Sequence, residues 1–379
     1  MGVVMKNIKT AVYLLAMCVG LLLLSACTEL TEGQEIPSAN PEGIVITVSC
    51  EEAALLREQA EQGDMTALTL LFGLYLGDDN IEQAVYWLTR AAELDDYEAQ
   101  FALGMMYLDG IGLTQDVGQA VYWLKRAVDQ DLDMAQIALD AIEGDAGAQS
   151  SIGMMYINGQ GVKQNHEQAL YWFRKAVEQD YATAQYNLAW MYFRGLSVTQ
   201  NYNQSSIWFR KAAEQGHASA QHDLGSLYYE GQGLPQSYEQ AAYWFRKAAD
   251  QGHAMAQYRL GFQYRLGEGL PQNYEQAAYW FRKAAIQSDA PAQIELGLMY
   301  FNGLGVTQSY EQAKYWFRKS AEQGNDMAQN NIGWMYHNGL GVEQNYEQAA
   351  YWYRKAVAQG NFGAHVNLQN LPAQYRQQH

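Results

Sequence analysis

Cysteine and histidine are the side chains most able to do chemistry at neutral pH, and this 379-residue sequence holds few of either. The cysteines are Cys18, Cys27 and Cys50, and the histidines are His166, His217, His222, His253, His337, His365 and His379. No CxxC pair occurs, so neither a disulfide framework nor a thiolate zinc site is indicated. The short motifs HExxH and GxSxG and the P-loop are also missing from the sequence. We therefore expect no enzyme activity, no metal and no cofactor.

Cys27 is the one cysteine for which the sequence indicates a chemical role, because of the residues that precede it. Lys6 and Lys9 stand before an apolar run over residues 11–24, and Ser25 and Ala26 follow it. This is the pattern of a signal peptide, and the run is too short for a comfortable membrane span. The stretch Leu24-Ser25-Ala26-Cys27 resembles the bacterial lipobox, which implies cleavage before Cys27 and lipidation of its sulfur. An ordinary cleaved signal peptide with a chance cysteine is the alternative.

The lipobox resemblance implies a signal peptide over residues 1–26 and a lipidated tether over residues 27–49. Lipidation would anchor the chain to a membrane. Thr28 resembles the outer-membrane default of bacterial lipoproteins, so we expect an outer-membrane lipoprotein that faces the periplasm, with display at the cell surface left open. Residues 44–48 (IVITV) have the composition of a strand.

The balance of charge excludes one class of partner. The formal net charge is −17, and the sequence has no basic stripe. Because a surface of this sign repels phosphate backbones, we expect no nucleic-acid binding.

Two sequence markers recur with a period of 36 residues. A Tyr-Trp pair, written Ile-Trp once, begins at residues 86, 122, 171, 207, 243, 279, 315 and 351. Ala-Gln recurs at 99, 135, 148, 184, 220, 256, 292 and 328, with a single step of 13. Two markers in register indicate tandem repeats.

Each repeat contains two helical patterns. In one repeat, the first helix is predicted over roughly residues 253–266, with Ala256, Leu260 and Tyr264 on one face and glycines at its end. The second, over residues 273–285, begins with a capping-box pattern in which Asn273 caps the helix and Gln276 reaches back. One such helix pair cannot bury its apolar stripe alone, so neighbouring copies must bury one another.

The pattern A-x-x-x-L-G-x-x-Y, then G-x-G, then Y-E-Q-A-x-x-W-F-x-K-A-A closely resembles the Sel1-like repeat, which is related to the tetratricopeptide repeat. The match covers residues 64–361. The resemblance implies an all-α fold, an α/α solenoid in which about eight helix-turn-helix repeats of 36 residues form a right-handed superhelix. It implies an adaptor or scaffold and does not imply catalysis.

The ends and one irregularity depart from the pattern. Residues 50–63 resemble a second helix without the aromatic pair and are predicted to cap the amino-terminal end. Residues 362–379 are predicted to form a capping helix, ending near Leu371-Pro372, and a frayed tail. An insertion at 131–147 restarts a first helix, so we expect either a kink between two blocks, 50–130 and 144–370, or a harmless duplication.

Positions two, six and nine residues after the Ala of the first helix point away from its partner helix and toward the inner wall of the superhelix. They differ between repeats yet stay largely apolar, which is typical of interaction surfaces. Some of them must fill the seam between adjacent first helices. Arg194 and Arg265 would suit a carboxylate on the ligand. The predicted partner-binding residues on this concave face are Tyr186, Trp190, Phe193, Arg194, Tyr229, Tyr258, Phe262, Arg265, Phe301, Trp334 and His337.

The leading functional hypothesis is a lipid-anchored periplasmic scaffold that binds proteins or extended peptides along this wall. A second is a cell-wall-associated hydrolase or a binder of β-lactams or peptidoglycan, although the chain lacks the paired repeat cysteines of family members linked to that activity. A third is a secreted or surface-displayed factor that engages host proteins.

Overall fold

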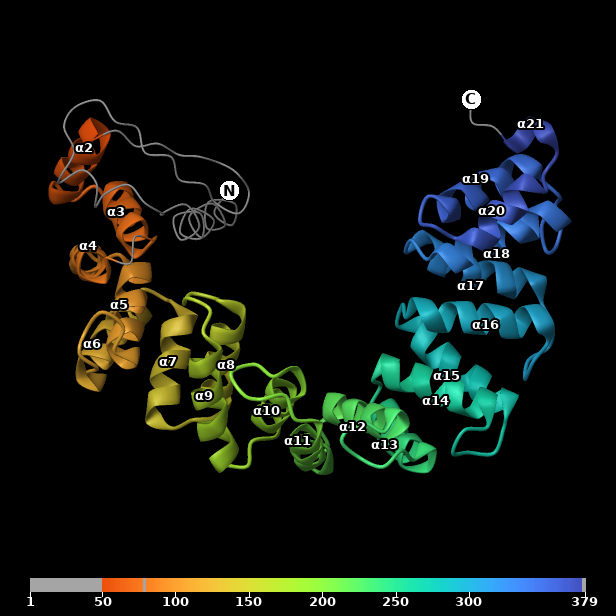
Figure 1. Cartoon of the computed structure of the whole chain (residues 1–379), viewed down its shortest axis with the longest axis horizontal. Helices are drawn as coiled ribbons and strands as arrows, with labels where there is room; N and C mark the ends of the chain where they lie inside the picture. The colour runs from red at the N-terminus through yellow and green to blue at the C-terminus, as the bar shows by residue number, and fades with distance from the viewer. Residues whose placement is uncertain (1–49, 78–79, 377–379) are drawn as a thin grey trace. The chain divides into compact units, whose positions relative to one another are not determined.

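The structure, a computed structural model, describes residues 50–77 and 80–376. That part of the chain folds into helices α2 to α21 without a strand, which confirms an all-α solenoid of tandem repeats (Figure 1). The expected signal peptide, the lipidation site Cys27 and the strand-like run at 44–48 lie outside the described residues.

Sixteen of the helices form eight pairs. The first helices of the pairs are α3 (Met65–Gly77), α5 (Tyr97–Asp109), α8 (Ala146–Asn158), α10 (Ala182–Arg194), α12 (Ala218–Glu230), α14 (Ala254–Leu266), α16 (Ala290–Asn302) and α18 (Asp326–Asn338). The second helices are α4 (Ile81–Glu93), α6 (Val117–Val128), α9 (His166–Glu178), α11 (Tyr202–Glu214), α13 (Tyr238–Asp250), α15 (Tyr274–Ile286), α17 (Tyr310–Glu322) and α19 (Tyr346–Val357). Helices α2 (Cys50–Glu61), α7 (Asp133–Glu143), α20 (Phe362–Gln369) and α21 (Ala373–Arg376) complete the set.

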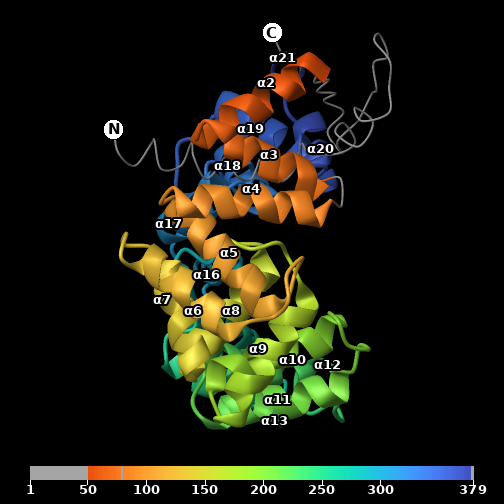
Figure 2. The same ribbon diagram turned by 90° about the vertical axis from the view of Figure 1, so that its left-hand side faces the viewer.

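The described part of the chain divides into two compact units, one that ends at residue 179 and one that begins at residue 180. Within each unit, helices that follow one another in sequence pack side by side (Figures 1 and 2). The division falls after α9, and the kink expected at the 131–147 insertion, with a harmless duplication as its alternative, stays a prediction. The insertion lies inside the first unit because α7 packs on both α6 and α8.

The two units differ in charge. Residues 50–179 hold 22 acidic and 7 basic residues, a net of −15. Residues 180–379 hold 15 of each and are neutral overall. The acidity of the protein therefore belongs to its amino-terminal half.

The second helices begin with one of the two hydrogen bonds of the predicted capping box. The side chain of Asn273 accepts a hydrogen bond from the Gln276 N–H at 2.9 Å, as expected for an N-cap. The Asn273 N–H, which was expected to meet the Gln276 side chain, instead donates to the Tyr264 carbonyl of the preceding helix at 2.9 Å. The same backbone bond recurs in the neighbouring repeats, so the cap also fixes the second helix to the first.

The two glycines of the G-x-G loop have different roles. Gly267 ends α14 in the left-handed conformation, with φ of 76°, a common helix stop. Gly269, with φ of 70°, lies against the previous repeat, where an added Cβ would come within 2.2 Å of the Tyr238 carbonyl carbon. The second glycine therefore permits close stacking of repeats.

The core of each repeat is completed by its neighbour. Phe281 of α15 packs against Gly261 of α14, where a Cβ would lie 2.8 Å from the ring. Trp280, on the same helix, is buried with Phe245 of the preceding repeat and Leu260 of its own repeat. This arrangement explains why the Tyr-Trp-Phe phrase recurs, since the Trp joins adjacent repeats and the Phe holds one repeat together.

The Gln of the Ala-Gln marker is a buried polar link between repeats. Gln257 donates its Nε2 to the Ala249 carbonyl at 3.0 Å. Its Oε1 accepts from Gln287 Nε2 of the next connection at 2.8 Å. Equivalent Gln–Gln bonds follow every repeat from α5 to α18, so we call this set the glutamine ladder.

Helix α7 takes the place of a second helix. Gln149 of α8 donates to the Ala141 carbonyl of α7 at 3.2 Å, as ladder glutamines do to a second helix. Gln179 donates to the Gly144 carbonyl at 2.8 Å. Although the Ala135-Gln136 marker resembles the start of a first helix, Gln136 is exposed and bonds to Asp140. The insertion thus gives α8 the packing surface that the second helix of the preceding repeat provides elsewhere.

The carboxyl-terminal segment is ordered through Arg376, contrary to the expected fraying. Leu371 is fully buried, and α21 lies against α19, where Arg354 donates to the Tyr375 carbonyl at 2.7 Å. The rings of Tyr346 and Tyr375 also pack together.

Candidate protein-binding face

The predicted binding residues lie on the first helices α10, α12, α14, α16 and α18 of the second unit. We call their side chains at the non-shared positions the first-helix face. Several other residues at the non-shared positions are buried and fill the seam between adjacent helices, as expected for some of them. They are Phe101, Met105, Leu108, Ser150, His222 and Ile294. All eleven predicted residues are half-buried or exposed.

An aromatic cluster on α10 begins this face. The rings of Tyr186 and Trp190 are 6.5 Å apart, and those of Trp190 and Phe193 are 5.1 Å apart. Tyr186 and Trp190 both rest on the buried Phe209, which fixes their positions. The exposed Arg194 guanidinium lies 5.1 Å from the Trp190 ring, a cation–π arrangement.

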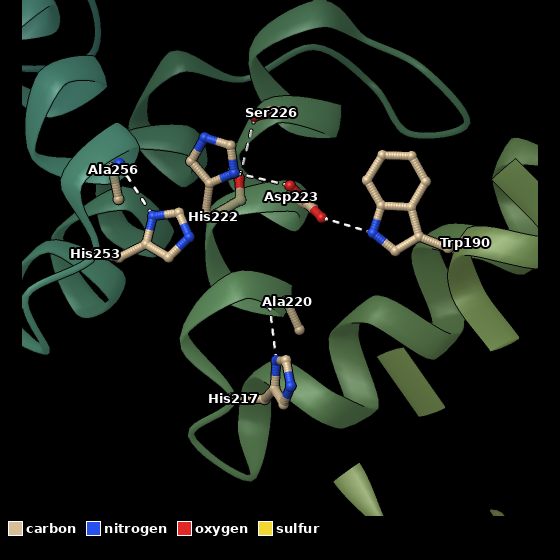
Figure 3. Close-up of polar contacts among 8 residues, drawn as sticks. All are labelled: Trp190, His217, Ala220, His222, Asp223, Ser226, His253 and Ala256. Atoms are coloured by element: carbon tan, nitrogen blue, oxygen red, sulfur yellow. Dashed lines mark hydrogen bonds and ion pairs between the residues drawn. The ribbon is translucent and has the colours of Figure 1, made fainter. Parts of the chain in front are cut away.

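A polar network adjoins the aromatic cluster (Figure 3). Trp190 donates its Nε1 hydrogen to Asp223 Oδ2 at 3.0 Å. His222 Nδ1 lies 2.7 Å from Asp223 Oδ1. Burial, together with the nearby Asp223 charge, raises the pKa of Tyr186 to about 12. The carboxylate of Asp223 therefore locks Trp190 and His222 in place.

Two histidines of the network serve as helix caps. The Nδ1 atoms of His217 and His253 accept from the Ala220 and Ala256 N–H groups at 3.2 and 3.3 Å (Figure 3). Burial lowers the pKa of both histidines, which suits a role that needs an unprotonated Nδ1. The ring of His253 stacks on that of His222 at 4.9 Å.

The face continues on α14 with Tyr258 and Phe262, whose rings are 6.0 Å apart. Arg265 lies 4.6 Å from the Phe262 ring and forms an ion pair with Glu295 at 3.4 Å. Burial raises the pKa of Glu295, and Arg265 opposes that rise. The charge of Arg265 is thus already matched within the fold, which does not favour its predicted role toward a ligand carboxylate.

The remaining predicted residues extend the face to α18. Phe301 packs against Trp334 of the next repeat at 5.5 Å, and Trp334 keeps 38% of its surface exposed. His337 packs against Tyr346, and burial lowers its pKa. Tyr229 donates to Glu268 at 2.7 Å. The predicted residues therefore form a row along successive helices.

Two further findings concern the described residues. None of their His, Cys, Asp and Glu side chains gather into a group of three that could hold a metal ion. Within the same described ranges, no helix is both long and apolar enough to cross a membrane.

The comparisons with known proteins identify the repeats. The Sel1 repeat model matches residues 66–96, 98–132, 146–181, 182–217, 218–253, 254–289, 290–325 and 326–361. The chain belongs to the Sel1 repeat family. Sel1 repeat proteins generally mediate protein–protein interactions, and the repeat is typically a non-catalytic scaffold.

Two crystal structures of Sel1 repeat proteins are similar to this chain. A protective antigen of uropathogenic Escherichia coli strains that displays an SLR fold is 36% identical, with a TM-score of 0.58 over 83% of this chain and 66% of that one. A Sel1 repeat protein from Oxalobacter formigenes is 31% identical, with a TM-score of 0.56 over 83% of this chain and 89% of that one. This chain therefore spans 66% of the length of the E. coli antigen. No curated protein matches the sequence significantly.

Sequence reasoning missed Asp223 and Glu295, the carboxylates that hold Trp190 and Arg265. Both stand three residues after the Ala of the first helix, at a position where the repeats also place Asn187, Arg259 and Asn331. The sequence signal that could have indicated these two carboxylates is that one position of the repeat carries different polar residues in different repeats.

Proposed function

We propose that this Sel1 repeat protein is a lipid-anchored scaffold of the cell envelope, whose first-helix face in residues 180–379 binds a protein or an extended peptide. The observation that carries the proposal is the row of partly exposed aromatic residues at non-shared positions, from Tyr186 to Trp334. Most of these rings rest on the core with one side, so only their exposed parts are left for a partner to cover.

Two features of the row support a protein partner. Aromatic side chains and arginine are the commonest anchors of protein interfaces. Trp190 and Tyr186 are held in position by Phe209 and Asp223, so little side-chain entropy is lost when a partner binds. Arg194, which has no ion pair among the described residues, supplies a cation for a carboxylate on the partner.

The test is cross-linking and pull-down from an envelope extract with the double variant Trp190→Ala/Phe262→Ala. We expect loss of the captured partner, because both anchors of the densest part of the row are removed. The control is Tyr243→Ala/Tyr279→Ala, which removes two rings from second helices that are 49% and 47% exposed. If the first variant keeps its helical circular dichroism and captures the same partners as the control, the proposed face is wrong.

The anchor is tested separately with Cys27→Ser. We expect the wild-type chain to incorporate labelled palmitate and to sediment with membranes, and the variant to do neither. Sedimentation and labelling that survive the substitution would exclude Cys27 as the anchor.

Display at the cell surface is the second candidate, because a protein 36% identical to this chain is a protective antigen. Protease treatment of intact cells separates the two orientations. We expect a periplasmic chain to resist the protease until the outer membrane is opened, whereas a surface-displayed chain would be digested at once.

A further inference from the structure

A cavity in the first unit lies beside the insertion, because its lining includes Ile142 of α7. It has a volume of about 430 Å³ and lies where the end of α5 and the start of α6 meet α7 and α9. Helix α9 contributes the shared residues of a second helix, and α7 contributes Ile142. The residues used in the argument below are Asp109, Ile142, Glu167, Tyr171, Trp172 and Lys175.

A cation found in three of the regular repeats is missing here. In three successive repeats, an Arg of a second helix donates to the hydroxyl of the Tyr eighteen residues later, as Arg210 does to Tyr228 at 2.5 Å. The residue eighteen before Tyr156 is Ala138, because α7 replaces the second helix. Tyr156 instead donates its hydroxyl hydrogen to Asp109.

Asp109 is therefore a carboxylate with a neutral partner. Burial raises its pKa to about 6, and the Tyr156 hydrogen bond opposes the rise. The group is largely ionised at pH 7.5, and no cation pairs with it within the described residues. Asp109 is half-buried, and a partly desolvated charge without an opposite charge is costly, so an entering cation would be favoured at this carboxylate.

The rest of the cavity suits the same ligand. Glu167 adds a second carboxylate against the single ammonium of Lys175. Lys175 Nζ lies 4.8 Å from the Tyr171 ring and 5.5 Å from the Trp172 ring, and the same lysine–tyrosine contact recurs on other second helices. These rings therefore accept a cation, and an entering cation would take the place of Lys175 beside them. The surrounding unit carries a net charge of −15 from residues 50–179, which attracts cations from solution.

We propose that this cavity binds the guanidinium or ammonium head of an alkyl cation, with Asp109 as its counter-ion and Tyr171 and Trp172 beside it. The site is separate from the first-helix face and does not depend on it. Such a head comes either from a basic side chain of a partner protein or from a free amine.

The test is an NMR titration of the tryptophan indole signals of the purified protein at pH 7.5. The probes are acetyl-Gly-Arg-Gly-amide, the neutral isostere in which citrulline replaces arginine, and agmatine. We expect saturable shifts with the two cations and none with the citrulline peptide. Tighter binding of the arginine peptide would assign the site to a partner's side chain, and equal or tighter binding of agmatine would assign it to a free amine.

Two variants make the result specific. Asp109→Asn keeps an acceptor for Tyr156 but removes the charge, and we expect the Kd for the cations to rise about tenfold or more. Glu230→Gln removes a carboxylate from the same helix position of α12, where it is exposed, and we expect no change. The proposal is overturned by the absence of saturable shifts, by binding of the citrulline peptide, or by equal effects of the two variants.

Discussion

Gln287 donates its side-chain amide to the side-chain oxygen of Gln257 at 2.8 Å, although the two residues lie thirty positions apart in the chain. Gln257 is 3% exposed, so this is a buried polar contact between adjacent repeats. Buried polar groups without partners are costly, and the ladder therefore fixes which groups of neighbouring repeats must meet.

Gln257→Leu tests the glutamine ladder. The substitution removes the bonds to the Ala249 carbonyl and to Gln287, and we expect the free energy of unfolding to fall by about 1–3 kcal/mol. Urea unfolding followed by circular dichroism measures it. Gln276→Leu changes an exposed glutamine of the same repeat and should alter the value by less than about 0.5 kcal/mol. Equal effects would mean that the ladder does not stabilise the stack.

Gly269→Ala tests the close approach of repeats. The new Cβ would meet the Tyr238 backbone at 2.2 Å in a left-handed conformation, so we expect a loss of about 2–5 kcal/mol from strain and overpacking together. Thermal unfolding provides the measurement.

The matched control for Gly269→Ala is Gly252→Ser. Gly252 also has a positive φ, of 91°, but a Cβ there meets nothing within 4 Å. Ser288 occupies the equivalent position one repeat later with φ of 68°. We expect only the conformational cost of about 1–2 kcal/mol. A loss as large as that of Gly269→Ala would show that backbone conformation, and not the contact with Tyr238, explains the glycine at position 269.

The histidine caps predict a pH dependence. Burial lowers the pKa of His217 and His253 in the folded protein, so below the ordinary histidine pKa of about 6.5 the unfolded chain binds more protons than the folded one. Stability should fall as the pH drops from 7.5 to 5.5. The variant His217→Asn/His253→Asn keeps a capping oxygen, as Asn325 and Asn361 do in later repeats, and should lose less stability over this range. Parallel urea midpoints for the two proteins would contradict the assignment.

The ion pair on α14 predicts a double-variant effect. Arg265→Ala leaves the Glu295 side chain, which is 16% exposed, without its cation, and we expect a loss of about 1–3 kcal/mol in unfolding free energy. Adding Glu295→Gln should restore part of that loss, because the buried charge is removed as well. Additive losses would show that the two side chains do not interact.

The sequence was sufficient for the parts of the fold that repeat. The period of 36 residues, the two helices of each repeat, the N-cap at Asn273 and the glycine stop at Gly267 all follow from local patterns. The family match follows as well, because the shared residues make the contacts inside and between repeats.

Contacts that depend on how particular helices pack could not be predicted from the sequence in the same way. The capping-box pattern does not show that the Asn273 N–H bonds to Tyr264, because that bond depends on how the loop closes. The marker Ala135-Gln136 predicts a first helix, yet the packing surface that α8 needs makes α7 act as a second one. Arg265 was expected to meet a ligand because its partner, Glu295, lies on another helix.

The dual character of α7 also bears on how such arrays grow. One helix that satisfies α6 on one side and α8 on the other means that a gene need not gain or lose 36 codons at a time. Here 13 extra residues leave both junctions of α7 covered, so the array gains one helix and a new surface without gaining a whole repeat.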